Sequence, residues 1–189
     1  ATEVENNEAV EIAAEDLKGM ECYGGLDLAS TTDLNAFTLY FPLSNQEAAI
    51  LQWFWIPEST VYERTRRDGV KYMDWVEDGF IKTTPGDATD QQFIASDILE
   101  IAKIYDIKHI NFDKWNSGHF ENIMVDEGWD NRIHPFTQNM SSFSGPIKYF
   151  ERMLLNKRLK HFNHPVLTWN VLNVMLLFDG NENYKFDKK

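Results

Sequence analysis

The sequence has one cysteine, no long apolar run and few basic residues. Cys22 stands alone among 189 residues, which excludes an internal disulfide and a cysteine-rich zinc site. No apolar stretch approaches the roughly 20 residues that a membrane-spanning helix requires. We therefore expect a soluble protein that has no membrane partner.

Positive charge is scarce. The chain has 18 Lys and Arg against 30 Asp and Glu, a formal net charge of −12. Binding to nucleic acid through bulk charge depends on neutralised phosphates, so this balance disfavours it. Any contact with nucleic acid must be local or aided by cations.

The first fifteen residues are acidic and lack the cationic start and apolar core of a signal peptide. We interpret residues 1–15 as an acidic linker or arm and residues 16–189 as one domain. An apolar fraction of 43%, with 14% aromatic residues, is sufficient for a packed core. The sequence also lacks a glycine-rich phosphate loop ending in Gly-Lys-Ser/Thr, so we expect no ATPase motor within it.

Periodicity predicts strands first and then alternating helices and strands. Residues 22–30, 33–43 and 47–57 are predicted as three strands with short joins, which favours an antiparallel meander. A helix over 87–107, capped by Asp87 or Thr89, precedes a strand over 107–116, and a crossover of this kind makes parallel pairs. The fold class predicted is α/β, with a central mixed sheet of three antiparallel strands followed by parallel crossover strands, flanked by helices. The remaining predicted elements are a helical segment over 60–79 broken at Gly69, a helix over 118–129, a strand over 133–139, a helix over 145–159 starting at Pro146, and an apolar helix or strand over 164–186.

Two carboxylates end apolar strands. Asp27 lies between Leu26 and Leu28, and Asp113 ends the segment INFD. Each alone is more often a turn or capping residue than a ligand. Two such acids on neighbouring strands would converge, and converging carboxylates bind Mg²⁺ or Mn²⁺. Trp115, with Asn116, could position a bound strand, although a place in the core is the more ordinary interpretation for a tryptophan.

Basic residues gather in two places. The first cluster is Arg64, Arg66, Arg67 and Lys71. The second is our candidate DNA-binding surface, because Lys148 and Arg152 share one helix face at i, i+4; an ordinary solvated helix face is the alternative. Its residues are Lys148, Arg152, Lys157, Arg158 and Lys160.

Four segments, in this order, resemble the nuclease half of tailed-bacteriophage terminase large subunits: residues 16–42, 110–116, 144–174 and 179–189. The resemblance implies an RNase H-like fold and a metal-dependent endonuclease that cuts concatemeric double-stranded viral DNA during genome packaging. It also implies two divalent cations, Mg²⁺ or Mn²⁺. Asp27 matches the first metal ligand of the family, Asp113 the second, and Asp33 an acid that lies near the metals in some relatives.

The resemblance further implies partners and a location. These are double-stranded DNA, an ATPase motor domain in the same full-length chain, a small terminase subunit and a portal protein, in the cytoplasm of a bacterial host. The third carboxylate of the family lies on a helix that follows a segment like 183–189, so we expect it to be missing here. Asp179, Glu182 and Asp187 are not expected to replace it, because they occupy the preceding turn and strand.

Two alternatives stay open. The first is another RNase H-like nuclease, such as a resolvase or transposase core, which would share Asp27 and Asp113 but prefer branched or end-specific DNA. The second is a docking module without catalytic activity, whose acidic surface contacts the portal or the motor.

Overall fold

One sheet runs through the centre of the computed structural model, which describes residues 12–115 and 117–187. Within those residues the sheet has seven strands, in the order β4-β3-β2-β1-β5-β6, and β7 pairs with β3. A separate hairpin is formed by β8 and β9. The strands are β1 (Glu21–Asp27), β2 (Asn35–Pro42), β3 (Ala48–Pro57), β4 (Lys82–Thr84), β5 (Asp106–Asp113), β6 (Ile133–Phe136), β7 (Leu159–Lys160), β8 (Met175–Phe178) and β9 (Tyr184–Asp187).

Strand directions follow the predicted pattern. β1 pairs antiparallel with β2, and β2 pairs antiparallel with β3. β5 then lies parallel to β1, and β6 lies parallel to β5. The prediction of an α/β fold with three antiparallel strands followed by parallel crossover strands is confirmed. The short strands β4 and β7, both parallel to β3, were not predicted.

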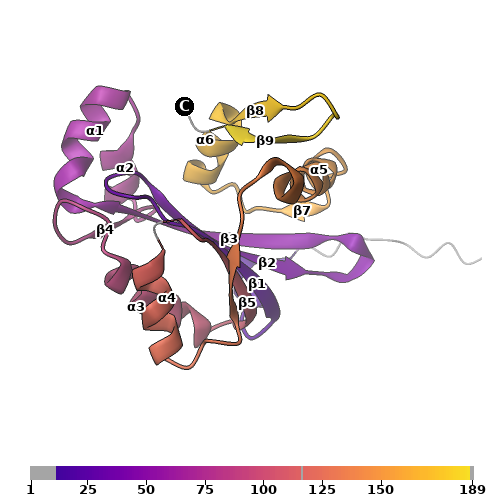
Figure 1. Cartoon of the computed structure of the whole chain (residues 1–189), viewed down its shortest axis with the longest axis horizontal. Coiled ribbons are helices and arrows are strands. Elements are labelled where there is room, and N and C mark those ends of the chain that lie inside the picture. The colour runs from indigo at the N-terminus through magenta and orange to yellow at the C-terminus, as the bar shows by residue number, and fades with distance from the viewer. Residues whose placement is uncertain (1–11, 116, 188–189) are drawn as a thin grey trace, which may run out of the picture.

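Helices cover both faces of the sheet. In Figure 1, α3 and α4 lie on one side, and α5, α6 and the β8–β9 hairpin lie on the other. No helix among residues 12–115 and 117–187 is long and apolar enough to cross a membrane. The helices are α1 (Val61–Asp68), α2 (Tyr72–Glu77), α3 (Gln91–Ala102), α4 (Gly118–Asp126), α5 (Met140–Leu155) and α6 (Pro165–Asn173), with 3₁₀ turns η1 (Ala14–Leu17), η2 (Ser44–Gln46) and η3 (Glu58–Thr60).

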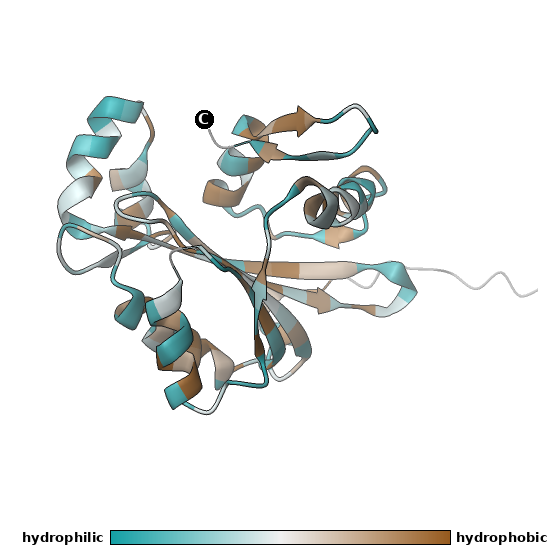
Figure 2. Ribbon diagram, viewed as in Figure 1, coloured by the Kyte–Doolittle hydropathy of each residue, from teal (hydrophilic) through white to brown (hydrophobic). Residues whose placement is uncertain are grey.

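Side chains alternate across the strands, and each face of the sheet therefore builds its own core. On the α3 and α4 side, Leu26, Phe37 and Phe112 pack in one cluster with Ile98 and Phe120. Smaller clusters form on the opposite face, where β3 meets α2, α5 and α6. In Figure 2 the sheet strands carry brown apolar segments, whereas α1 is mostly teal and hydrophilic. Strand β3 is buried along most of its length, so both of its faces are covered.

Gly24 marks the tightest point of the central strand. A Cβ atom there would lie 2.9 Å from Ile110 Cγ1 and 2.9 Å from Phe37 Cε2. At the next residue, Gly25, a Cβ would meet no heavy atom within 4 Å. The first glycine of the pair is therefore required by close packing, while the second faces open space.

Several predicted boundaries were wrong. The side chain of Asp90, not of Asp87 or Thr89, caps α3 by accepting a hydrogen bond from the Phe93 amide at 2.9 Å. Helix α5 begins at Met140, where Asn139 accepts from the Ser142 amide at 2.8 Å, so Pro146 lies inside the helix rather than at its start. The segment 164–186 divides into α6 and the β8–β9 hairpin. The break at Gly69 is confirmed by its left-handed φ of 65°.

The structure describes only residues 12–15 of the segment that we interpreted as an arm over 1–15. Residues 1–11 lie outside the described residues. Ile12 packs against the main core, and Leu17 in η1 is completely buried. The division at residue 16 stays a prediction.

Candidate active site

Asp27 and Asp113 end two neighbouring parallel strands. The residues just before them, Leu26 and Phe112, are partners in the β1–β5 register. Leu26 is 5% exposed and Phe112 is 1% exposed, both in the core against α3 and α4. Because successive side chains of a strand point to opposite faces, the two aspartates point away from that core, toward the α5 side of the sheet. The sequence prediction that these carboxylates lie at neighbouring strand ends is confirmed.

Both aspartates line one cavity of about 440 Å³. Its floor is the sheet face of β1, β2 and β5, and its walls come from β6 and from the first turns of α5. Asp27, Asp113, Phe136, Phe143 and Pro146 are among the lining residues. Two residues of α5, Phe143 and Pro146, thus form part of the cavity wall. Phe143 belongs to the helix because α5 starts five residues earlier than the sequence suggested.

A second cavity of about 480 Å³ adjoins the first. Asp27, Gln138 and Phe143 line both cavities, so Asp27 lies where they meet. The second cavity is bounded by β9, through Lys185 and Asp187. Sequence reasoning missed Gln138, which lies between β6 and α5, and Lys185. Lys185 was missed because only the docking of the C-terminal hairpin brings β9 to the carboxylates.

The loop after Asp113 is held by its own hydrogen bonds. The backbone N–H of Trp115 donates to Asp113 Oδ1 at 3.1 Å, and the buried Ser117 hydroxyl donates to the Asp113 carbonyl oxygen. The Trp115 side chain is 75% exposed, whereas the other five tryptophans are buried or half-buried. The expectation of a core position for Trp115 was therefore wrong. Asn116 lies outside the described residues.

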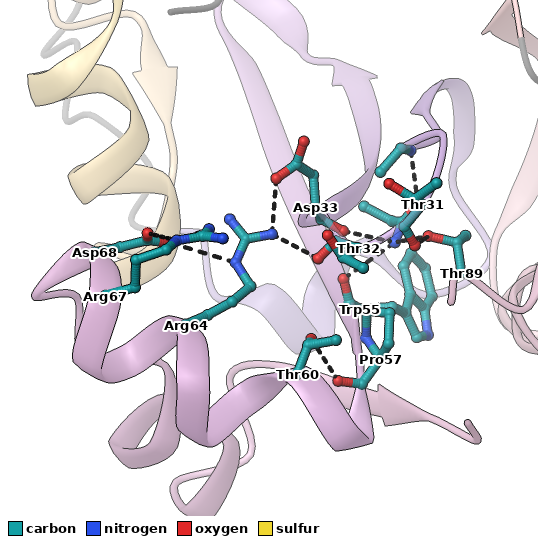
Figure 3. Close-up of polar contacts among 12 residues, drawn as sticks. Thr31, Thr32, Asp33, Trp55, Pro57, Thr60, Arg64, Arg67, Asp68 and Thr89 are labelled. Carbon is teal, nitrogen blue, oxygen red and sulfur yellow. Dashed lines mark hydrogen bonds and ion pairs between the residues drawn. The ribbon is translucent and has the colours of Figure 1, made fainter. Parts of the chain in front are cut away.

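Asp33 lies in a different environment. Figure 3 shows its carboxylate beside the guanidinium of Arg64, with an Nη1 to Oδ1 distance of 2.7 Å. Arg64 Nη1 also donates to the carbonyl oxygen of Thr32 at 2.5 Å, and Arg64 Nε lies 3.4 Å from Asp68 Oδ2. Among the described residues that line the two cavities around Asp27, Asp33 does not appear. The assignment of Asp33 as a metal ligand stays a prediction.

The two basic clusters differ in burial and in their contacts. Arg64 of the first cluster is buried, and Arg67 is paired with Asp68 at 2.6 Å. In the second cluster, Arg152 and Arg158 line one surface cavity beside Gln46. Arg152 lies about 9 Å beyond Pro146 along α5, at 1.5 Å per residue. The carboxylate cavity and the Arg152 part of the candidate DNA-binding surface therefore share helix α5.

Other members of that surface have partners on neighbouring elements. The Lys148 ammonium lies 5.4 Å from the ring centre of Tyr184, and Arg158 donates to Gln46 Oε1 at 2.7 Å. Lys160 Nζ lies 3.7 Å from Glu47 Oε1. Lys157 connects α5 to β7 in a left-handed conformation with φ 55°.

The carboxylate pair fits a hard divalent cation by ligand type. Mg²⁺ and Mn²⁺ prefer oxygen ligands, and Mg²⁺ is usually held by one or two carboxylates with water and substrate phosphates completing its shell. In the described part of the chain, no group of three or more His, Cys, Asp or Glu side chains could hold a metal ion. Asp27 and Asp113 therefore form a pair of candidate ligands.

Comparison with known proteins identifies the class. Residues 2–189 match the family described as the endonuclease domain of the terminase large subunit. The chain belongs to this family. It is 32% identical over 166 residues to the terminase large subunit of Enterobacteria phage HK97, covering 88% of this chain and 33% of the relative. It is also 26% identical over 174 residues to Protein YmfN of Escherichia coli (strain K12), covering 87% of this chain and 37% of the relative.

Solved structures give the same result for the fold. The crystal structure of the HK97 bacteriophage large terminase superposes with a TM-score of 0.84 at 31% identity, over 91% of this chain and 36% of that one. The large terminase nuclease from thermophilic phage G20c matches with a TM-score of 0.57 at 10% identity, over 87% of this chain and 70% of that one, and this likeness concerns the fold alone. The expected RNase H-like fold is confirmed. The chain spans about a third of the length of the curated relatives.

Proposed function

We propose that this terminase nuclease domain is a divalent-metal-dependent endonuclease that hydrolyses phosphodiester bonds of double-stranded viral DNA. Its role would be to cut concatemeric DNA during genome packaging. The observation that carries the proposal is the pairing of Asp27 and Asp113 at adjacent strand ends, facing one cavity. Membership of the family supports this role over that of a resolvase or transposase core.

Asp27 and Asp113 would hold two divalent cations, Mg²⁺ or Mn²⁺. Such cations, when bound, supply an activated water and stabilise the charge on the departing oxygen. Asp27 lies where the two cavities meet, so it is our candidate for a ligand shared by both cations. Mutual repulsion of the carboxylates would be relieved by the cations, which explains why an acidic pair can persist on a half-buried sheet face.

DNA would cross the α5 side of the sheet. From the carboxylates, the duplex would follow α5 toward Arg152 and Arg158, whose positive charges would bind its phosphates. Reversing Arg158 and Lys160 to Glu should weaken DNA binding and flatten its salt dependence, because phosphate contacts release counterions. An unchanged salt slope would remove this surface from the proposal. The wider surface comprises Lys148, Arg152, Lys157, Arg158 and Lys160.

Trp115 would contact the strand held at Asp113. A 75% exposed indole two residues from a candidate metal ligand, in a loop fixed by hydrogen bonds, is suited to stack on a base or to pack on a sugar. Such a contact adds affinity without adding charge.

The partners proposed follow from the family. An ATPase motor domain would belong to the same full-length chain, and the small terminase subunit and portal protein would complete the packaging machinery in the bacterial cytoplasm. The relatives are about three times as long as the part matched here, which leaves room for such a motor.

Supercoiled plasmid incubated with Mn²⁺, Mg²⁺ or EDTA tests the proposal. We expect nicked and linear products with either cation, none with EDTA, and none from Asp113→Asn. Cutting that persists in EDTA would contradict the metal requirement. Absence of cutting in every metal would favour the docking module, an acidic surface that contacts the portal or motor without catalysis.

A further inference from the structure

We propose that Lys185, on β9, binds the DNA phosphate backbone beside Asp27. This inference rests on the proposed function and names a substrate contact that neither basic cluster of the sequence includes. Lys185 lines the cavity that adjoins the carboxylate pair. Among the described residues that line the two cavities, it is the one basic side chain.

The hairpin that carries Lys185 is fastened to α5 on both sides of this residue. The Tyr184 hydroxyl donates to Glu151 Oε2 at 2.7 Å, and the Tyr184 amide donates to Ser144 Oγ at 3.4 Å. On the other side, the Phe186 ring lies 6.4 Å from that of Phe143, which itself lines both cavities. Lys185 is thus held at the cavity by its two neighbours.

The turn of the hairpin is also closed by hydrogen bonds. The carboxylate of Asp179 accepts from the Asn183 side chain at 3.0 Å and from the backbone amides of Asn181 and Asn183 at 2.8 and 2.9 Å. These hydrogen bonds lower the pKa of Asp179 below its usual range, and the bond from the Asn183 side chain has the largest effect. A closed turn fixes the register of β8 with β9, and therefore the position of Lys185 along the strand.

Charge explains why a lysine is needed at this point. A phosphate that approaches the cavity meets the carboxylates of Asp27, Asp113 and Asp187. A lysine ammonium is a compact point charge that binds phosphate well. With the acidic side chains that the structure describes, Lys185 forms no ion pair, in contrast to Lys160, which is paired with Glu47. Its ammonium is therefore available to a ligand.

The test measures DNA binding rather than cleavage, so it does not depend on the nuclease activity. Fluorescence anisotropy of a short duplex without divalent metal is recorded over a range of salt for the unaltered chain, Lys185→Ala and Lys185→Arg. Lys103→Ala is the matched control, because Lys103 lies at the end of α3, on the opposite side of the sheet, and removal of its charge changes the net charge equally.

We expect Lys185→Ala to weaken binding roughly tenfold, because one charge-assisted contact is lost. The slope of log K against log salt should become shallower by about 0.9. Lys185→Arg should keep most of the affinity, and Lys103→Ala should match the unaltered chain. If Lys185→Ala keeps both affinity and slope, the inference is overturned. A chain that cuts no DNA in any metal, yet shows the Lys185 effect on binding, would contradict the proposed nuclease activity and leave the phosphate contact supported.

Discussion

The carboxylate of Asp33 lies 2.7 Å from the guanidinium of Arg64, and this ion pair joins the loop after β1 to helix α1 (Figure 3). The Arg64 side chain is 10% exposed, whereas that of Asp33 is 75% exposed. Arg64 also stacks over the Tyr72 ring, 5.3 Å from its centre. Asp33, the first acidic residue after β1, thus fixes the loop next to the candidate site by pairing with Arg64.

Asp33→Asn should lower stability modestly and leave most cleavage intact. Arg64 would keep Asp68 and the Thr32 carbonyl as partners, and the lost pair is exposed on one side, so we expect a loss of about 0.5–1 kcal/mol. Urea unfolding and plasmid nicking in Mn²⁺ measure the two effects. A loss of cleavage as complete as that expected for Asp27→Asn would instead make Asp33 a metal ligand, as the resemblance suggested.

Gly24→Ala should destabilise the fold, because its methyl group would lie 2.9 Å from carbons of Ile110 and Phe37 in the packed sheet. Overpacking of this kind costs about 1–3 kcal/mol. Gly25→Ala is the matched control, since nothing lies within 4 Å of a Cβ there, and its stability should stay within about 0.5 kcal/mol. Denaturant unfolding of the pair provides the comparison. Equal stability of the two variants would contradict the close packing of Ile110 and Phe37 around Gly24.

Trp115→Ala should weaken DNA binding by about 1–3 kcal/mol, the value of one base–aromatic contact, and Trp115→Phe should recover part of it. Tyr62→Ala serves as control, because Tyr62 is 60% exposed on α1 and lines neither of the two cavities around Asp27. Anisotropy titrations with intact and nicked duplexes measure the effect. Similar losses in the Trp115 and Tyr62 variants would show that exposed aromatics in general, and not this loop, account for binding.

Cys22 should be unreactive in the folded protein. Burial, with the added effect of the Asp106 and Glu21 carboxylates, raises the pKa of the Cys22 thiol from 9.0 to about 12. The folded state holds this proton more tightly than the unfolded chain between those values, so the contribution of Cys22 to stability falls as pH rises through that range.

A thiol reagent such as DTNB at pH 8 tests this state of Cys22. The thiolate fraction in the folded chain should be roughly 10³-fold below that of an unperturbed cysteine, and the reaction should become fast only after unfolding in urea. A native rate close to the urea rate would place the thiol at the surface.

Local patterns were sufficient to predict the five strands β1, β2, β3, β5 and β6 and to mark Asp27 and Asp113 as candidates, whereas their role as ligands came from the family resemblance. Alternation around Leu39 and Phe41 indicated β2, and the acids that follow apolar runs indicated Asp27 and Asp113. These features depend on neighbours in sequence and on the rule that parallel strand ends meet at one edge of a sheet.

The features that were missed depend on contacts between distant segments. The two-residue strand β7 exists because Ala48 and Ala49 pair with it. Lys185 reaches the site because β9 docks on α5 through contacts such as that of Tyr184 with Glu151, which lies 33 positions away in sequence. Trp115 was assigned to the core by residue type alone, but its side chain is exposed in the loop after Asp113. No local pattern carries such information.

Mn²⁺-dependent nicking of supercoiled plasmid by Asp27→Asn, beside Asp106→Asn, tests the central claim most directly. Asp106 lies at the start of β5, whereas Asp113 lies at its end, and the Asp106 carboxylate forms an ion pair with Lys108 at 2.7 Å. Asp106→Asn therefore also removes one negative charge, but at the opposite end of the strand from the cavity. We expect Asp27→Asn to lose at least about a hundredfold in rate while its melting temperature without metal does not fall, because repulsion between carboxylates is relieved. The Asp106→Asn rate should equal that of the unaltered chain. Normal Mn²⁺-dependent cleavage by Asp27→Asn would contradict a nuclease centre at Asp27 and Asp113.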